Sequence, residues 1–186
     1  MVAFTTLNEL KGDEMIGKQA PDFQAKAFVN GRIEDFKLSK LRGKWVILFF
    51  YPADFTFVCP TEIEGFAEKY DQFKKAGAEV VAVSRDTVYV HQAWVEHDKR
   101  VSKAKYPMVE DRKGEISRDY GVLNENTGNA FRGLFIINPE GIIKYMVVTD
   151  DNVGRSTDET FRILSALQSG GLCPADWEPG EPTLKV

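Results

Sequence analysis

Cysteine is nearly absent from this sequence, whose 186 residues include only Cys59 and Cys173. Two thiols so far apart cannot build the disulfide framework that stabilises small secreted domains. They also form no CxxC pair, the usual signature of a general thiol–disulfide oxidoreductase. In a reducing compartment, we expect such cysteines to be catalytic, redox-sensing or simply buried.

Histidine, excess charge and long apolar runs are scarce as well. His91 and His97 lie six positions apart on a predicted helix, about 240° around its axis, so they cannot ligate one metal ion together. We expect both to be ordinary surface or interface residues. The net charge of −4 provides no basic footprint for nucleic acid. The longest apolar run, residues 45–51, is far shorter than the roughly 20 residues that span a bilayer.

Several other motifs are missing. The first seven residues contain neither a basic segment nor a continuous apolar one, which predicts no signal peptide and a cytoplasmic protein. No GxGxxG or GK[ST] motif is present to cradle a phosphate. The sequence therefore implies no metal, haem or flavin cofactor.

The stretch around Cys59 has the clearest local pattern. Residues 45–51 are apolar at every position, as expected for a central strand covered on both faces. After Pro52, a short loop leads to Cys59 and to a predicted helix of about four turns, with Pro60 in its first turn and Gly77 at its end. The unpaired N–H groups and positive dipole end of a helix favour a thiolate at this position.

The remaining elements follow from periodicity and turn residues. They are a hairpin over 23–38 around Asn30-Gly31, a strand at 78–84, a helix to about 100, an irregular section over 101–132 with a short helix near 115–120, strands at 134–137 and 142–148, and a helix opened by the capping box of Ser156 and Glu159. This order predicts an α/β protein with a thioredoxin-like fold, in which helices flank a central mixed sheet. We expect a single domain over 1–186, with an N-terminal hairpin and with 170–186 as an irregular tail.

A reactive thiol needs more than a helix end. An ordinary thiol has a pKa of about 8.5, and lowering it to about 6 takes roughly 3.4 kcal/mol. A helix N-terminus supplies about 1 to 2 kcal/mol, so a cation is also required. Arg132 is the candidate, because the loop entering the strand at 134–137 packs against the reactive cysteine in a thioredoxin-like fold; the alternative is a solvated surface arginine. Without a histidine base, the substrate must need little proton abstraction, and peroxide meets this condition by oxidising a thiolate to a sulfenic acid.

Each of these residues also has an ordinary structural interpretation. Cys59 could be a buried structural cysteine, and Thr56 could simply form the turn. Cys173 lies in the tail, where a mobile thiol could condense with a sulfenic acid, or where it could be incidental.

The segment Pro52-Ala53-Asp54-Phe55-Thr56-Phe57-Val58-Cys59 resembles the PxxxTxxC pattern of peroxiredoxins. Together with Arg132-Gly133-Leu134, Val153-Gly154-Arg155 and Cys173-Pro174-Ala175-Asp176-Trp177, it makes the whole chain similar to a typical two-cysteine peroxiredoxin of the alkyl hydroperoxide reductase C-subunit kind. The peroxide-sensitive members carry a Gly-Gly-Leu-Gly insertion and a Tyr-Phe ending, and neither is found in this sequence. The resemblance thus favours a robust antioxidant scavenger over a signalling protein.

The resemblance implies a role for each matching residue. Cys59 would be the peroxidatic cysteine, Thr56 the residue whose hydroxyl bonds the peroxide, Pro52 a shield against water, and Arg132 the cation that holds the thiolate and the peroxide oxygens. Glu62 and Arg155 would form the supporting pair. Cys173 would resolve the sulfenic acid of the other subunit.

The implied partners are a hydroperoxide, a second copy in a homodimer that assembles into a decamer ring, and an external dithiol reductant, either thioredoxin-like or a dedicated flavoprotein. Two alternatives stay open at this stage: a general thiol–disulfide oxidoreductase of the same fold, and a structural or holdase-type assembly with incidental cysteines.

Overall fold

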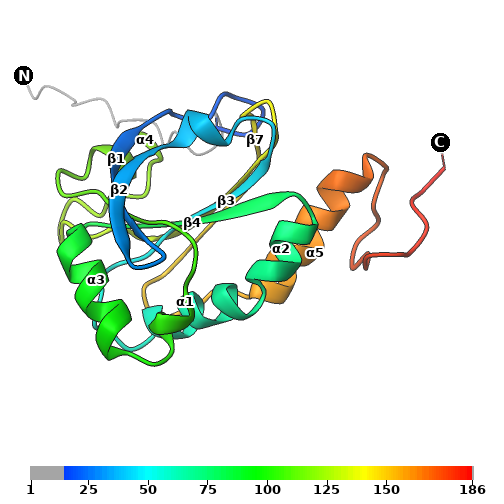
Figure 1. The fold of residues 1–186 in the computed structure, drawn as a ribbon. Helices are drawn as coiled ribbons and strands as arrows, with labels where there is room; N and C mark the ends of the chain where they lie inside the picture. The colour runs from blue at the N-terminus through cyan, green and yellow to red at the C-terminus, as the bar shows by residue number, and fades with distance from the viewer. Residues whose placement is uncertain (1–14, 186) are drawn as a thin grey trace, which may run out of the picture.

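The computed structural model describes residues 15–185, built around one mixed sheet of seven strands in the order β2-β1-β5-β4-β3-β6-β7 (Figure 1). The strands are β1 Gln24–Val29, β2 Arg32–Lys37, β3 Trp45–Phe50, β4 Ala78–Ser84, β5 Met108–Glu110, β6 Arg132–Ile137 and β7 Ile143–Thr149. The helices are α1 Cys59–Glu68, α2 Tyr70–Lys75, α3 Val88–His97, α4 Glu115–Asp119 and α5 Thr157–Ser169, with 3-10 turns at Leu38–Leu41 and Val101–Lys103. No helix in the described range has the length and apolarity to cross a membrane.

The strand directions confirm the predicted thioredoxin-like fold. β3 runs parallel to β4 and antiparallel to β6, and β6 continues into β7 through an antiparallel hairpin. The apolar segment expected at the centre is β3, which has a neighbour on each side. Because only the loop 51–58 separates α1 from β3, the first residue of α1 lies near the carboxyl end of a central strand, where α/β folds place their sites.

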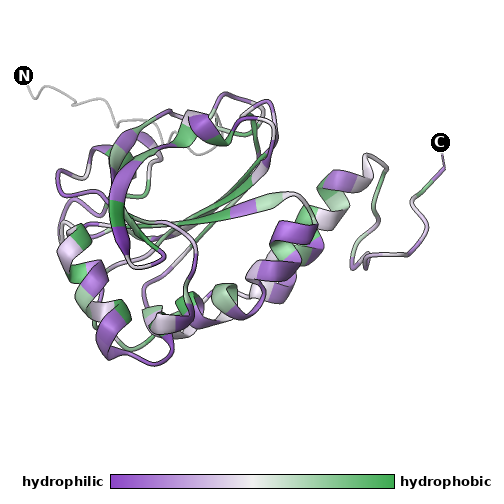
Figure 2. Ribbon diagram, viewed as in Figure 1, coloured by the Kyte–Doolittle hydropathy of each residue, from purple (hydrophilic) through white to green (hydrophobic). Residues whose placement is uncertain are grey.

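Alternate residues of β3 enter two separate cores. Val46, Leu48 and Phe50 pack with residues of the N-terminal segment, of α4 and of the loop after it. Ile47 and Phe49 pack instead with the apolar sides of α1, α2, α3 and α5. Figure 2 shows the result, with the central strands mostly in the hydrophobic colour and the helices carrying hydrophilic residues on their outer sides. Covering both faces is what makes every position of this strand apolar.

Three details differ from the prediction. The four-turn helix is divided into α1 and α2, because the backbone at Lys69 leaves helical geometry with ψ of 3°. The section 101–132 contains β5, whose three residues are too few to show a periodic pattern. β6 begins at Arg132, two residues before the expected strand. Of residues 1–21, which precede the hairpin, the structure describes only 15–21.

The C-terminal tail follows α5 as turns, with an isolated bridge between Leu172 and Leu184 (Figure 1). Trp177 is only 4% exposed, and its ring nitrogen donates to the carbonyl of Glu181 at 3.0 Å. Arg162 of α5 donates to the carbonyl of Trp177 at 2.8 Å. The predicted irregular tail is thus folded back on itself and attached to α5.

Candidate active site

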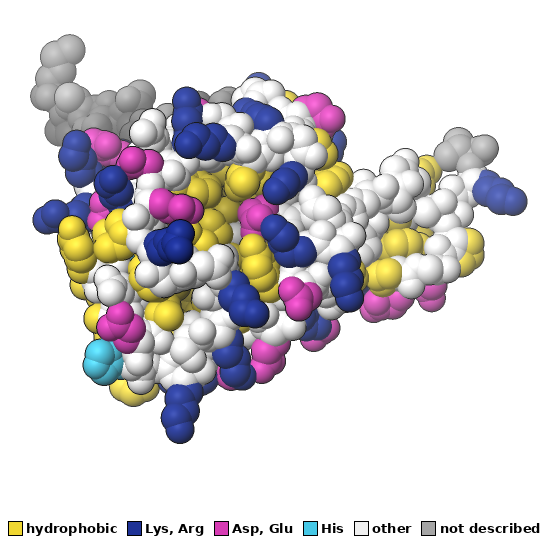
Figure 3. All heavy atoms as spheres, in the orientation of Figure 1, with side chains coloured by type: hydrophobic (Ala, Val, Ile, Leu, Met, Phe, Trp, Pro, Cys, Tyr) yellow, Lys and Arg dark blue, Asp and Glu magenta, His cyan; other side chains and the backbone are white. Residues whose placement is uncertain are grey.

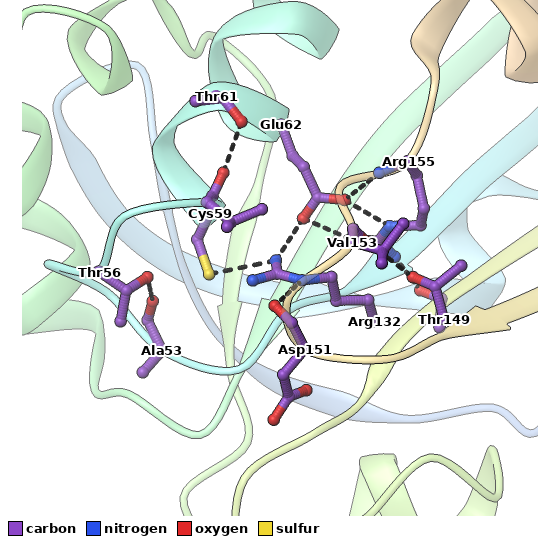
Figure 4. A network of polar contacts seen from close by, with 12 residues as sticks. Ala53, Thr56, Cys59, Thr61, Glu62, Arg132, Thr149, Asp151, Val153 and Arg155 are labelled. Carbon is purple, nitrogen blue, oxygen red and sulfur yellow. Dashed lines mark hydrogen bonds and ion pairs between the residues drawn. The ribbon is translucent and has the colours of Figure 1, made fainter.

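The turn from β3 into α1 places Cys59 at the first position of a ten-residue helix. Its thiol is free and fully buried. Pro60 occupies the first turn of α1, where its missing N–H costs no helical hydrogen bond. Figure 4 shows the sulfur pointing away from the helix towards the side chain of Arg132. The thiol therefore lies at the positive end of the α1 dipole, which favours its ionised form.

The loop before Cys59 brings Pro52 and Thr56 to the same region. Pro52 is buried, and the Thr56 hydroxyl donates to the carbonyl of Ala53 at 2.9 Å (Figure 4). With its proton engaged in this way, the hydroxyl of Thr56 has its oxygen lone pairs to offer to a ligand near the sulfur.

Arg132, the first residue of β6, lies against the thiol from the neighbouring strand. Its Nη1 donates to Cys59 Sγ at 3.3 Å and to Glu62 Oε2 at 2.6 Å, and its Nε donates to the carbonyl of Asp151 at 2.8 Å. Burial alone would lower the pKa of Arg132, but the contacts with Cys59 and Glu62 raise it above its usual value. A guanidinium that stays charged beside the sulfur stabilises a thiolate.

Glu62, one turn into α1, joins Arg132 to Arg155. Arg155 donates from Nε to Oε1 at 2.7 Å, from Nη2 to Oε2 at 3.0 Å, and from its backbone nitrogen to Oε1 at 2.8 Å. Burial raises the pKa of Glu62, but hydrogen bonds and the charge of Arg155 bring it below its usual value. The carboxylate stays ionised and fixes the orientation of both guanidinium groups (Figure 4).

Cys173 is the predicted site residue that the fold does not bring to the others. It follows α5, half-buried, with its sulfur 3.4 Å from Ser169 Oγ. The first residue of α5, Thr157, lies close to Gly65 of α1, and the 13 residues of α5 then extend about 20 Å away from the site. The two cysteines of one chain are therefore held at opposite ends of α5.

One expectation about histidine is wrong. His91 was expected at the surface or in an interface, but it is fully buried within the chain, and its Nδ1 lies 2.7 Å from Asp54 Oδ2 in the loop before Cys59. The available signal was spacing, since Val88, His91 and Trp94 recur every three residues on the buried side of α3. Asp151 was also missed, because it contributes a backbone carbonyl that no side-chain pattern reveals.

A hollow visible on one face is separate from these residues. It lies between β2 and α2, with Phe36, Leu41 and Tyr70 among its lining residues, and Lys40 and Lys105 line it as well (Figure 3). None of its lining residues belongs to the group around Cys59, so it is not the candidate active site.

A buried thiol at a helix start, contacted by a charged guanidinium on a thioredoxin-like sheet, defines a thiol-dependent oxidoreductase. Comparison with known proteins agrees. The family model described as the AhpC/TSA family matches residues 16–146. Over 182 residues, the chain is 47% identical to Peroxiredoxin-1 of Gallus gallus, covering 94% of this chain and 92% of that protein. It is 50% identical over 179 residues to the YkuU protein of Bacillus subtilis, covering 92% and 99%.

Solved structures give the same result. AhpC of Enterococcus faecalis superposes with a TM-score of 0.83 at 40% identity, covering 86% of this chain and 99% of that one. AhpC of Mycobacterium tuberculosis has a TM-score of 0.81 at 36% identity, covering 88% and 98%. The chain belongs to the AhpC/TSA family and is a peroxiredoxin, a thiol-dependent peroxidase.

Proposed function

We propose that Cys59 reduces hydrogen peroxide and organic hydroperoxides as part of antioxidant defence. The sulfur of the thiolate donates an electron pair to one peroxide oxygen, the O–O bond breaks, and the sulfur becomes a sulfenic acid. The leaving oxygen takes up a proton from solvent, which replaces the one that the thiol released on ionising, and departs as water or an alcohol. The contact of 3.3 Å between Arg132 Nη1 and Cys59 Sγ is the observation that carries this proposal.

The surrounding side chains have complementary roles in this reaction. Arg132 stabilises the thiolate before the reaction and the negative charge that moves onto the leaving oxygen during it. Thr56 accepts a hydrogen bond from the peroxide and aligns it, while Pro52 excludes water from the sulfur. Glu62 and Arg155 keep Arg132 in position. A guanidinium held in place beforehand costs little reorganisation when the charge moves.

Cys173 resolves the sulfenic acid in our proposal, but in a second copy of the chain. Its thiolate attacks the sulfenic sulfur of the partner subunit, hydroxide leaves and becomes water, and an intersubunit disulfide forms. The separation imposed by α5 within one chain supports this assignment. An external dithiol, from a thioredoxin-like protein or a dedicated flavoprotein reductase, then reduces the disulfide and restores both thiols.

We also propose an antiparallel homodimer that assembles into a decamer. β7 lies at one end of the sheet, so its outer edge has backbone groups available to pair with a second β7. A second surface combines the loop before Cys59 with the start of α3, which Asp54 and Asp86 hold together; its aromatic side chains Phe55, Phe57 and Tyr89, named here the apolar patch, are exposed at 57%, 93% and 72%. Exposed aromatic side chains of this kind are typical of protein interfaces. Two separate surfaces are what a ring of dimers requires.

The chain functions as a single domain over 1–186 in this proposal, with the tail carrying the resolving thiol. Both cysteines are free, and the cycle depends on a dithiol reductant. A reducing compartment such as the cytoplasm fits these requirements.

A non-reducing gel tests the proposal. One equivalent of hydrogen peroxide is expected to convert the reduced protein into a disulfide-linked dimer. Cys59→Ser should give no dimer and no sulfenic acid. Cys173→Ser should give no dimer, but it should still form a sulfenic acid that dimedone traps at Cys59. Dimer formation that survives either substitution would contradict the mechanism.

A further inference from the structure

Asp54, five residues before Cys59, is held by two buried side chains, Tyr51 at the start of the same loop and His91 of α3. Its Oδ1 accepts from the Tyr51 hydroxyl at 2.7 Å, and its Oδ2 lies 2.7 Å from His91 Nδ1. Tyr51 and His91 are fully buried, and Asp54 is 7% exposed. Buried contacts to a carboxyl group are strong, because water does not compete for them. The polar groups of these three residues bond to one another and not to Cys59, whose sulfur is contacted by Arg132, so the roles proposed above do not account for them.

The protonation state of Tyr51 fixes the direction of its hydrogen bond to Asp54. Burial and the nearby Asp54 raise the pKa of Tyr51 well above its usual value, so its hydroxyl keeps its proton and can donate to Asp54. The hydroxyl also lies 3.4 Å from His91 Nδ1, so the three side chains form a closed group. The carboxyl group of Asp54 is thereby attached at once to the end of β3 and to α3.

The backbone of Asp54 is attached to a third element. Its N–H donates to Asp86 Oδ2 at 2.9 Å, and the same oxygen accepts from the hydroxyl of Ser84 at 2.8 Å. Ser84 is the last residue of β4 and is fully buried. Asp54 is thus fixed through both its side chain and its backbone, unlike an ordinary loop residue.

The next residue, Phe55, has a strained backbone. Its φ of +55° lies in the left-handed region, which costs about 1 to 2 kcal/mol for a residue with a side chain. Such a conformation persists only where neighbouring contacts impose it. The contacts of Asp54 on one side, and the Phe55 ring lying 6.0 Å from the Trp94 ring, supply that constraint. The reversal at Phe55 sets the direction in which Thr56 follows.

We propose that Tyr51 and His91, acting through Asp54, are positioning residues that hold Thr56 in register with Cys59 for peroxide binding. This inference rests on the function proposed above for Thr56 and Cys59. Releasing the Asp54 carboxyl group removes the constraint on Phe55, and the Thr56 hydroxyl then loses its fixed place beside the sulfur. The thiolate itself is stabilised from the other side of the site, by Arg132, and does not depend on this cluster.

Two reactions of the Cys59 thiol distinguish a misplaced Thr56 from a general disruption of the site. Peroxide reduction requires the aligned loop, whereas alkylation by iodoacetamide requires only the thiolate and access to it. In Tyr51→Phe, the rate constant with hydrogen peroxide is expected to fall about ten- to hundred-fold, while alkylation changes by less than about threefold. Rates are compared on protein of the same oligomeric mass as the wild type.

Tyr120→Phe provides the matched control. Tyr120 is 1% exposed, and its hydroxyl donates to the carbonyl of Pro21 at 2.9 Å, so the variant loses one buried tyrosine hydrogen bond in the other core. It should keep the peroxide rate of the wild type. A peroxide rate in Tyr51→Phe equal to that of this control, or an equal loss in peroxide reduction and alkylation, would overturn the inference.

A second pair of variants covers the case in which Tyr51→Phe does not fold. The amide of Asp54→Asn can accept from Tyr51 and donate to the His91 ring, so this variant should keep the peroxide rate within about threefold. Asp54→Ala should lose it as Tyr51→Phe does, and equal rates in the two would contradict the proposal. Failure of the proposed function looks different, because the wild type itself would then react no faster than Cys59→Ser.

Discussion

Arg132 Nη1 donates to the sulfur of Cys59 at 3.3 Å, although 73 positions separate the two residues in sequence. Strand pairing in the sheet explains this contact. β6 pairs antiparallel with β3, so the first residue of β6 lies beside the turn that follows β3 and starts α1. The pairing of two central strands, rather than any flexible loop, brings the guanidinium to the thiol.

Replacing Arg132 should slow two reactions of Cys59 together. In Arg132→Met, we expect the rate constant with hydrogen peroxide to fall about 10²- to 10³-fold, as is typical when one charge-stabilising donor is removed. Iodoacetamide alkylation should fall as well, because the variant loses the cation that stabilises the thiolate. Stopped-flow kinetics and timed alkylation give the two rates.

The exposed Arg118, paired only with Glu125, provides the control for this experiment. Arg118→Met should leave both rates within about twofold of the wild type, since a surface ion pair contributes little. Near-normal peroxide kinetics in Arg132→Met would remove the electrostatic argument for this site.

Glu62 should make stability depend on pH in a defined direction. Its pKa in the folded protein is lowered from the reference value of 4.5, chiefly because Arg155 outweighs the effect of burial. A group of this kind stabilises the fold above the unfolded pKa and loses that contribution as the pH falls through the lower, folded value. Glu62→Gln leaves two buried guanidinium groups without their carboxylate and should cost about 3 to 5 kcal/mol at pH 7.

Urea unfolding at several pH values measures this effect. The difference in free energy of unfolding between the wild type and Glu62→Gln should be constant from pH 7 to about 5 and should shrink below about pH 4.5. Glu125→Gln, which changes an exposed carboxylate, should follow the wild type throughout. A difference that grows towards low pH would mean that Glu62 is protonated in the folded state.

Much of this site could be predicted from local sequence. Strand β3 was evident from seven consecutive apolar residues, and the position of Cys59 from the proline-containing break that follows them. Half of the capping box also formed as expected, because Ser156 Oγ accepts from the backbone nitrogen of Glu159. The carboxylate of Glu159 instead pairs with Arg162. These features depend on residues that are close in sequence, so their patterns are complete within a short window.

Features that depend on tertiary contacts were harder to predict. Lys69 gave no sign that it would interrupt a continuous amphipathic pattern. The burial of His91 was hard to predict because the carboxyl group that contacts its ring, that of Asp54, lies in a loop 37 positions earlier. β5 has three residues and owes its extended form to β4 and β1 on either side. The burial of His91 and the formation of β5 both depend on partners that are distant in sequence.

Gly133, next to Arg132 in β6, should tolerate no side chain. A Cβ atom there would lie 2.6 Å from Cγ1 of Val122, closer than carbon atoms normally approach. Gly133→Ala should therefore destabilise the protein by about 1 to 3 kcal/mol, measured by urea unfolding, and shift Arg132 away from the sulfur. The double variant with Val122→Ala removes the contact of 2.6 Å and leaves contacts of 3.3 Å with Cβ at position 122 and with Cε2 of Phe135. The double variant should lose less free energy of unfolding than the sum of the losses in the two single variants. A loss equal to that sum would contradict the predicted clash.

The apolar patch of Phe55, Phe57 and Tyr89 should control assembly beyond the dimer. Phe57 is 93% exposed, so an apolar ring in water gains most when a second subunit covers it. Sedimentation velocity should show the proposed ring for the wild type and dimers for Phe57→Asp, because a charge in that interface would have no partner. Ile33→Asp, which changes another exposed apolar side chain on the edge strand β2, should leave the ring intact. A wild-type mass distribution in Phe57→Asp would exclude the patch as the surface that joins dimers. Dissociation of the dimer into monomers would instead mean that the patch belongs to the interface within the dimer.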